Sequence, residues 1–151
     1  MDKKIQEFIK IRNEVVSTIN SFSKEKRLVV LFDQWSLKDV IAHLSNWMVH
    51  DIDCIKALRE NREPYWEPEV DKFNRKGFEA RKDKDWTEVY KEFIDLGNQL
   101  IDLYKTLPDN LWDKPIWLNK SETAQKFLEE NISHWKTEHL GSLIEKLRQN
   151  N

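Results

Sequence analysis

The chain has 151 residues, which is the usual size of one domain and is long enough to bury a core without disulfides. Charged residues make up 34% and hydrophobic residues 39%, a composition typical of a globular domain and not of a disordered one. The formal net charge of -2 argues against a dedicated nucleic-acid-binding protein, which usually carries a basic excess. A single cysteine excludes an intrachain disulfide.

The first residues run straight into an amphipathic pattern without an apolar signal region, and no apolar run approaches the length of a membrane span. Together with the single cysteine, this predicts a cytoplasmic protein with no membrane partner. Seven tryptophans are spread along the chain. They favour large core side chains and helix-end anchors, and an aromatic pocket for a small organic ligand is the alternative.

The first two predicted helices cover most of the first 60 residues. Apolar residues at helical spacing predict a helix from about Lys3 to Asn20. Arg12 falls inside its apolar stripe, where a charged group needs an acidic partner unless it reaches the surface. A connector follows, and Ser36 with Asp39 then favours a helix start by mutual capping. The second helix continues to about Glu60.

A short helix is predicted from Val70 to about Arg81. Asp85 and Glu88 form a capping-box pattern at the start of a third long helix, which runs to about residue 106. Gly97 lies on the inner face of this helix and indicates close approach by a neighbouring element.

The last helix is predicted from near Ser121 to about Arg148. With only three glycines and four prolines and no strand-rich segment, the pattern predicts an all-α protein. We expect one four-helix bundle domain over residues 1–151, with the short extra helix between helices 2 and 3.

All four histidines fall in two of these helices, His43 and His50 in the second and His134 and His139 in the last. Imidazole is a common metal ligand and an acid or base near neutral pH. If the two helices face each other, their imidazoles can converge in one pocket. This clustering is the strongest pointer to a site in the sequence.

Polar residues recur on the expected inner face of the last helix, where Asn131, Trp135, Glu138 and His139 stack at spacings of three to four. With His43, Glu138 and His139 make a two-histidine, one-carboxylate set, and three protein ligands with an open position are typical of a catalytic metal site. The alternative is a closed, hydrogen-bonded structural network.

His134 lies at the edge of that face. It is five residues from His139, which separates the two by about 140° on a regular helix. They are therefore not expected to clamp one ion easily. Cys54 has no adjacent base in the sequence, so a small buried residue is the better interpretation than a nucleophile.

Three stretches of the chain resemble the DinB/YfiT-like four-helix bundle superfamily of metalloenzymes. Residues 35–47 read WSLKDVIAHLSNW and look like its second-helix signature. A second stretch matches one branch of the superfamily, near the colibactin self-protection proteins, through residues 71–74 (DKFN), Arg81 and residues 86–89 (WTEV). Its last helix is similar to residues 138–140 (EHL) followed by Leu143 and Ile144.

The resemblance implies a divalent ion, such as Zn, Ni or Mn, held by one histidine of the second helix and two of the last, four residues apart. His43 matches the first ligand and His139 the final one. The middle ligand falls at Trp135, and His134 stands one place too early. The resemblance therefore implies that either His134 or Glu138 substitutes or that the metal has been lost. It also implies a possible homodimer.

Three functions follow as hypotheses. The first is a small-molecule enzyme, a metal-assisted hydrolase or thiol-dependent transferase, with Glu138 and Arg12 as catalytic residues. The second is a metal-free binding or self-protection protein with an aromatic pocket. The third is a non-catalytic structural or interaction bundle. The residues expected to bind a small-molecule substrate are Trp47, Asn74, Asn131 and Trp135.

Overall fold

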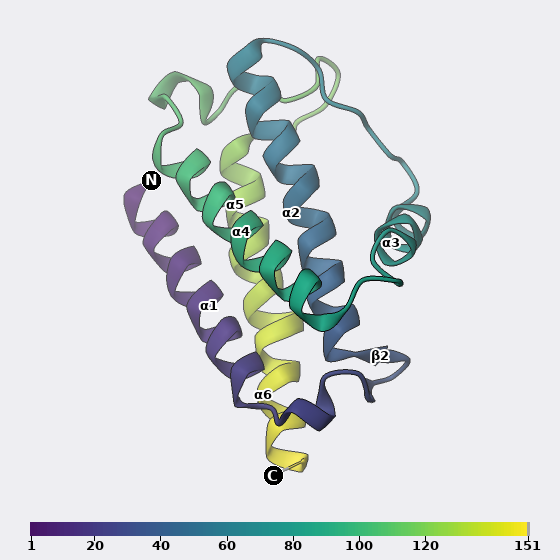
Figure 1. Cartoon of the computed structure of the whole chain (residues 1–151). Coiled ribbons are helices and arrows are strands. Elements are labelled where there is room, and N and C mark those ends of the chain that lie inside the picture. Colours follow the sequence, from purple (N-terminus) through teal and green to yellow (C-terminus); the bar gives the residue numbers. More distant parts are fainter. Residues whose placement is uncertain (151) are drawn as a thin grey trace. The chain divides into compact units, whose positions relative to one another are not determined.

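The computed structural model describes residues 1–150 and is mostly helical, as the sequence predicts. None of the helices in this described part is both long and apolar enough to cross a membrane. The long helical segments are α1 (Asp2–Ser21), α2 (Leu37–Glu60), α4 (Trp86–Lys105), and a continuous run formed by α5 (Ala124–His134), the π-helical segment η3 (Trp135–Leu140) and α6 (Gly141–Gln149) (Figure 1). The short elements are α3 (Val70–Glu79) and the 3-10 turns η1 (Lys24–Lys26) and η2 (Asp109–Leu111).

Contacts divide the chain into two compact units. Unit 1 combines Met1–Val40 with Leu128–Asn151, and unit 2 is Ile41–Phe127. The boundaries fall inside α2 and inside α5, so each of these helices contributes to both units. The two units are described in turn.

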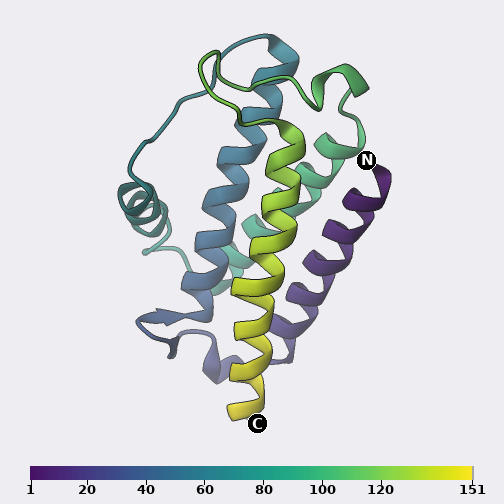
Figure 2. The same ribbon diagram turned by 180° about the vertical axis from the view of Figure 1, so that it is seen from behind.

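In unit 1, α1 packs against η3 and α6, and both ribbon views show α1 running beside this part of the chain (Figure 1 and Figure 2). Burial of one helix face follows from the apolar spacing predicted in the sequence. The core of unit 1 is completed by Trp135, Leu140 and Leu143 from the C-terminal run. The buried residues of α1 are Ile5, Phe8, Ile11, Val15 and Ile19.

A small antiparallel sheet lies where the sequence was expected to give only a connector. β1 (Val30–Phe32) pairs with β2 (Trp35–Ser36), and α6 contacts β1. Asp33 turns the chain with a positive φ of 56°, a conformation that Asp tolerates better than most residues. The sequence predicted a connector here and no strand-rich segment, and it missed these two short strands because a three-residue strand is too short to show a periodicity.

Both predicted capping boxes are confirmed. At the start of α2, the Ser36 N–H donates to the Asp39 carboxylate at 2.8 Å, and the Asp39 N–H donates to the Ser36 hydroxyl at 3.2 Å. At the start of α4, the Asp85 N–H donates to Glu88 at 2.9 Å and the Glu88 N–H donates to Asp85 at 2.8 Å. Such caps contribute about 1 kcal/mol each, so local chemistry sets both helix starts.

In unit 2, α3 lies close against α2 at a glycine. The Asn46 side-chain amide donates to the Phe73 carbonyl at 3.1 Å, and a Cβ placed on Gly77 would lie 2.4 Å from Asn46 Cγ. The sequence pointed to Gly97 for a close approach. Gly97 is buried in α4, and the tight contact described here is at Gly77.

A buried arginine joins α3 to α4. The Arg81 guanidinium binds Glu92 through two nitrogens, at 3.0 and 2.9 Å, and donates a third hydrogen bond to the Gly77 carbonyl at 3.1 Å. This fork geometry is specific to arginine, because a lysine ammonium does not bind a carboxylate through two parallel N–H groups.

The last helix begins later than predicted, at Ala124 rather than near Ser121. The preceding residues fold back on themselves instead, with the Ile116 N–H donating to the Glu122 carbonyl at 2.9 Å. The Thr123 hydroxyl then accepts the Lys126 N–H at 3.2 Å, which is the hydrogen bond of a helix N-cap.

Candidate functional site

The π-helical segment changes the relation between the two C-terminal histidines. His134 ends α5 and His139 lies inside η3, so the chain between them follows the wider π register, whose hydrogen bonds span five residues. Their Nε2 atoms lie 2.9 Å apart, with ring centroids at 4.6 Å. The expectation that these residues point about 140° apart was wrong, because it assumed a regular α-helix.

The short Nε2–Nε2 distance indicates a hydrogen bond between the two imidazoles. A hydrogen bond between two imidazoles requires one Nε2 to donate and the other to accept. The pair therefore holds a single proton between its two facing nitrogens. The same nitrogens offer two lone pairs to one metal ion when both imidazoles are neutral and carry their protons on Nδ1. His139 is buried and His134 is exposed, so the pair reaches from the interior to the surface.

Trp135, at the position where the resemblance implies a ligand, belongs to the core of unit 1. It is buried and meets Phe8 of α1 edge-to-face, with ring centroids 5.4 Å apart and planes at 72°. An edge-to-face pair of this size adds about 0.5–1.5 kcal/mol beyond the burial of area. Trp135 is buried and His134 is exposed, in agreement with the inner face predicted from the sequence. A substrate-binding role for Trp135 stays a prediction.

Glu138, predicted to share the inner face with His139, is exposed. The inner-face placement was wrong because it used regular helical spacing across the π segment. Asn131 is half-buried, as is Arg12 on α1. Arg12 donates from Nη1 to the Asn13 side-chain oxygen at 3.3 Å, and an acidic partner for it stays a prediction.

Unit 2 holds the remaining residues predicted for the site. His43 is buried in α2, and its ring stacks on Phe78 of α3 with centroids 6.4 Å apart and planes at 22°. Two residues predicted to bind substrate lie together, since the Trp47 indole N–H donates to the Asn74 side-chain oxygen at 3.2 Å. Both are half-buried, and their hydrogen bond ties α3 to α2.

A cysteine, histidine and aspartate arrangement on α2 was missed by sequence reasoning. The Cys54 sulfur lies 3.8 Å from His50 Nε2, and His50 Nδ1 lies 3.1 Å from the Asp51 carboxylate. The four-residue spacing of His50 and Cys54 was the available signal. Cys54 is fully buried, and this burial, with the nearby Asp51 and Asp53 carboxylates, raises the pKa of its thiol. The thiol is therefore protonated near neutral pH and is shielded from substrates.

Aromatic rings surround His50 on several sides. Phe73 and Phe127 lie at 5.7 and 5.8 Å between ring centroids, and Trp47 and Trp117 at 5.6 and 6.2 Å. These rings come from α2, α3, α5 and the loop before α5, so His50 lies at the meeting point of several segments of unit 2. The surroundings favour a structural role for this imidazole.

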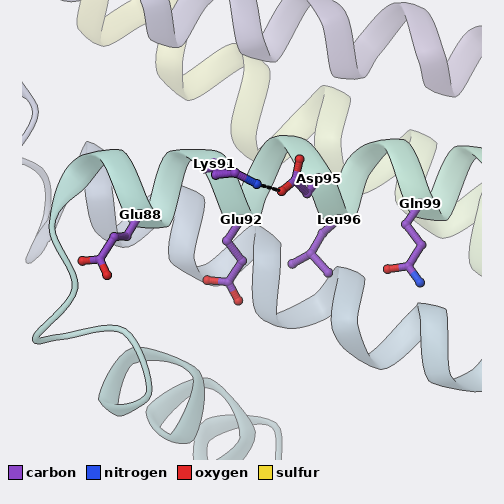
Figure 3. Close-up of a pocket in the computed structure, with 6 residues that line it drawn as sticks. All are labelled: Glu88, Lys91, Glu92, Asp95, Leu96 and Gln99. Atoms are coloured by element: carbon purple, nitrogen blue, oxygen red, sulfur yellow. Dashed lines mark hydrogen bonds and ion pairs between the residues drawn. The ribbon is translucent and has the colours of Figure 1, made fainter.

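A shallow groove of about 400 Å³ follows the surface of α4, and Figure 3 shows its side chains projecting from one helix. Lys91 and Asp95 form an ion pair there. None of the predicted site residues lines the groove, so it has no connection with the histidine chemistry. Its lining residues are Glu88, Lys91, Glu92, Asp95, Leu96 and Gln99.

Comparison with known proteins gives no matching family model, no matching curated protein and no matching solved structure.

Proposed function

We propose that this protein is a small-molecule enzyme of the DinB-like four-helix bundle type that binds a divalent metal ion through His134 and His139. The observation that carries the proposal is the 2.9 Å separation of their Nε2 atoms. Two imidazole nitrogens bound to one ion at about 2.05 Å lie roughly 2.9 Å apart at a right angle and roughly 3.4 Å apart at the tetrahedral angle. The observed distance therefore matches a chelating pair with little rearrangement.

The resemblance implies the third ligand of the proposed ion, because His43 corresponds to its second-helix ligand. His134 then replaces the ligand expected at position 135. Three imidazoles suit Zn, Ni or Mn and leave a coordination position open. A divalent ion held there would act as a Lewis acid toward a water or thiol reactant.

We propose distinct tasks in the hydrolysis or thiol transfer for the other residues predicted from the sequence. Glu138 is exposed and adjacent to His139 in the chain, so it can exchange protons with solvent. The Arg12 guanidinium can orient an anionic group of the substrate. Trp47, Asn74 and Asn131 remain the residues that we propose for substrate contact.

A metal-free binding protein is the second candidate, and one observation favours it. The His134–His139 hydrogen bond at 2.9 Å satisfies both facing nitrogens without an ion. In that case the imidazoles serve as hydrogen-bonding or acid–base groups beside an aromatic pocket. A closed structural network is the third candidate, and it differs from the second in binding no ligand.

Metal content tests the proposal directly. Untagged protein is loaded with Zn, Ni or Mn, dialysed, and measured by plasma mass spectrometry beside the variants His43→Ala, His134→Ala and His139→Ala. We expect near-stoichiometric metal in the unmodified protein and loss in each variant. The matched control is His50→Ala, because His50 is held by Asp51 and Cys54 and should leave the metal content unchanged.

Two outcomes would overturn the proposal. One is absence of bound metal after loading in a protein that is folded by circular dichroism. The other is equal loss of metal in His50→Ala and in the three site variants. Either outcome turns the search toward organic ligands of a metal-free pocket.

A further inference from the structure

Three consecutive aliphatic residues are exposed where the chain enters the small sheet of unit 1. Leu28 is 66% exposed, Val29 46% and Val30 57%. The first two follow the turn η1, and Val30 begins β1. We call these three residues the hairpin patch. Single exposed aliphatic residues are common on protein surfaces, whereas contiguous ones mark sites of interaction.

The hairpin patch is anchored at both of its ends. The Lys38 N–H donates to the Arg27 carbonyl at 3.2 Å, which ties the residue before the patch to the first turn of α2. At the other end, Val30 pairs with Ser36 in the sheet. Both ribbon views show the hairpin of β1 and β2 projecting away from α1 (Figure 1 and Figure 2). The apolar side chains are therefore carried by a fixed turn.

Basic residues flank the hairpin patch. Lys24 and Lys26 belong to η1, and Arg27 directly precedes Leu28. Lys38 is the fourth, because its N–H is bound to the Arg27 carbonyl. Lys24 is exposed and the other three are half-buried, as is typical of basic side chains whose stems pack while their charged ends reach water.

Acidic residues offset this charge only in part. Glu25 lies within η1, and Asp33 lies at the far end of the hairpin, after β1. The Asp39 carboxylate is engaged in the cap of α2, where it accepts the Ser36 N–H at 2.8 Å and the Ser36 hydroxyl at 2.7 Å. The side of the hairpin patch next to η1 therefore carries more positive than negative charge.

We propose that the hairpin patch docks on an anionic membrane surface. Its three aliphatic side chains enter the apolar edge of the bilayer, and the flanking basic residues contact lipid phosphate groups. The aliphatic composition favours a bilayer over a protein partner. Leucine and valine are under-represented among the residues that dominate protein interfaces, where tryptophan, tyrosine and arginine are enriched, whereas a bilayer favours burial of any apolar area.

Docking of this kind does not require a membrane span. The sequence predicted no membrane partner because no apolar run approaches the length of a span, and a surface turn needs no such run. The hairpin patch also contains none of the proposed metal ligands. The proposal is therefore independent of the metal site.

Co-sedimentation with lipid vesicles tests the proposal. We expect the protein to bind vesicles of phosphatidylcholine mixed with phosphatidylserine, and to bind less at raised salt or with phosphatidylcholine alone. Leu28→Asp should weaken this binding by at least about tenfold, because the inserted leucine is lost. The matched control is Leu118→Asp, which makes the same change at an 85% exposed leucine of unit 2 and should leave binding unchanged.

A second variant pair tests the basic residues. Lys24→Gln removes one positive charge beside the hairpin patch and should weaken binding to the phosphatidylserine vesicles by about fivefold. The matched control is Lys3→Gln, at an exposed lysine near the start of α1, and should bind as the unmodified protein does. Circular dichroism and melting temperature confirm that all variants fold.

Several outcomes would overturn the proposal. These are no binding of the folded protein to phosphatidylserine vesicles, unchanged binding of Leu28→Asp, or equal loss of binding in Leu118→Asp. Capture of an apolar peptide by the hairpin patch without vesicle binding would assign this surface to a protein partner instead. Vesicle binding should persist in EDTA, and a requirement for metal would also contradict docking by the hairpin patch.

Discussion

Deleting Lys136 tests whether the π register brings His134 and His139 together. Lys136 is exposed and lies between the two histidines within the π segment. A π segment carries one residue more than an α-helix of the same path, so the deletion allows a regular helix to form. The histidines then stand four residues apart, separated by about 40° on successive turns. We expect their imidazoles to stay in contact.

Deleting Ser133 is the matched control. It also removes one exposed residue and also allows the π segment to close. The histidines remain five residues apart, however, and a regular helix separates them by about 140°. We expect their contact to be lost. The Lys136 deletion should unfold within about 1 kcal/mol of the unmodified protein, because it removes a solvent-exposed side chain and restores ordinary helical geometry. The Ser133 deletion also moves the buried Trp135 by one helix position, so it should cost about 2–4 kcal/mol.

The readout is nitrogen-15 NMR of the imidazoles, which identifies the donor and acceptor Nε2 atoms and does not depend on metal. The contact seen at 2.9 Å should give one protonated and one unprotonated Nε2 in the Lys136 deletion and no such pair in the Ser133 deletion. Zinc titration then gives the corresponding affinities. Loss of the pair in both variants, or retention in both, would refute the argument from helix register.

Three further predictions concern packing and charge. Gly77→Ala forces the Asn46 side chain aside and should lower the free energy of unfolding by about 1–2 kcal/mol, net of the gain in helix propensity. Adding Asn46→Ala should restore the lost stability. A single variant that is more stable in urea than the unmodified protein would contradict the predicted clash. Arg81→Ala leaves the Glu92 carboxylate without its two-nitrogen partner and should lower the free energy of unfolding by about 2–4 kcal/mol. Arg81→Lys should restore only part of that free energy. Equal stability of the two variants and the unmodified protein would contradict this prediction. Because burial raises the pKa of the Cys54 thiol in the folded state, its contribution to stability is complete below the unfolded pKa of about 8.5 and is lost as pH rises above it, by about 1.4 kcal/mol per pH unit. Urea unfolding at pH 8 and pH 10 should show this loss, and Cys54→Ala should lack it; an identical alkaline loss in the variant would exclude the thiol as its source.

The helix starts were predictable because their causes are local. Each helix start depends on two residues that hydrogen-bond to one another's backbone N–H groups within a single turn. A four-residue pattern is therefore enough to predict it, and the pairs are Ser36 with Asp39 and Asp85 with Glu88. The two strands at the end of the connector, within residues 30–36, were harder to predict because they are only three and two residues long. Strands this short do not show an alternation of apolar and polar residues.

The candidate site was predictable in its residues but not in its geometry. The histidines stood out by composition, and His139 is buried as expected. The π register lies where Trp135 packs on Phe8, a residue of a helix more than 100 residues earlier in the chain. Glu138 is exposed in this register. Spacing rules for regular helices could not supply either result.

The ring cluster around His50 gives the molecule an optical reporter of its own folding. Neighbouring imidazole and thiol groups quench indole fluorescence, and the Trp47 and Trp117 rings lie 5.6 and 6.2 Å from His50. We therefore expect the emission of these two tryptophans to be weak in the native state and to brighten when α2, α3 and the loop before α5 separate. Local opening of unit 2 should then be visible in the fluorescence of an unlabelled sample.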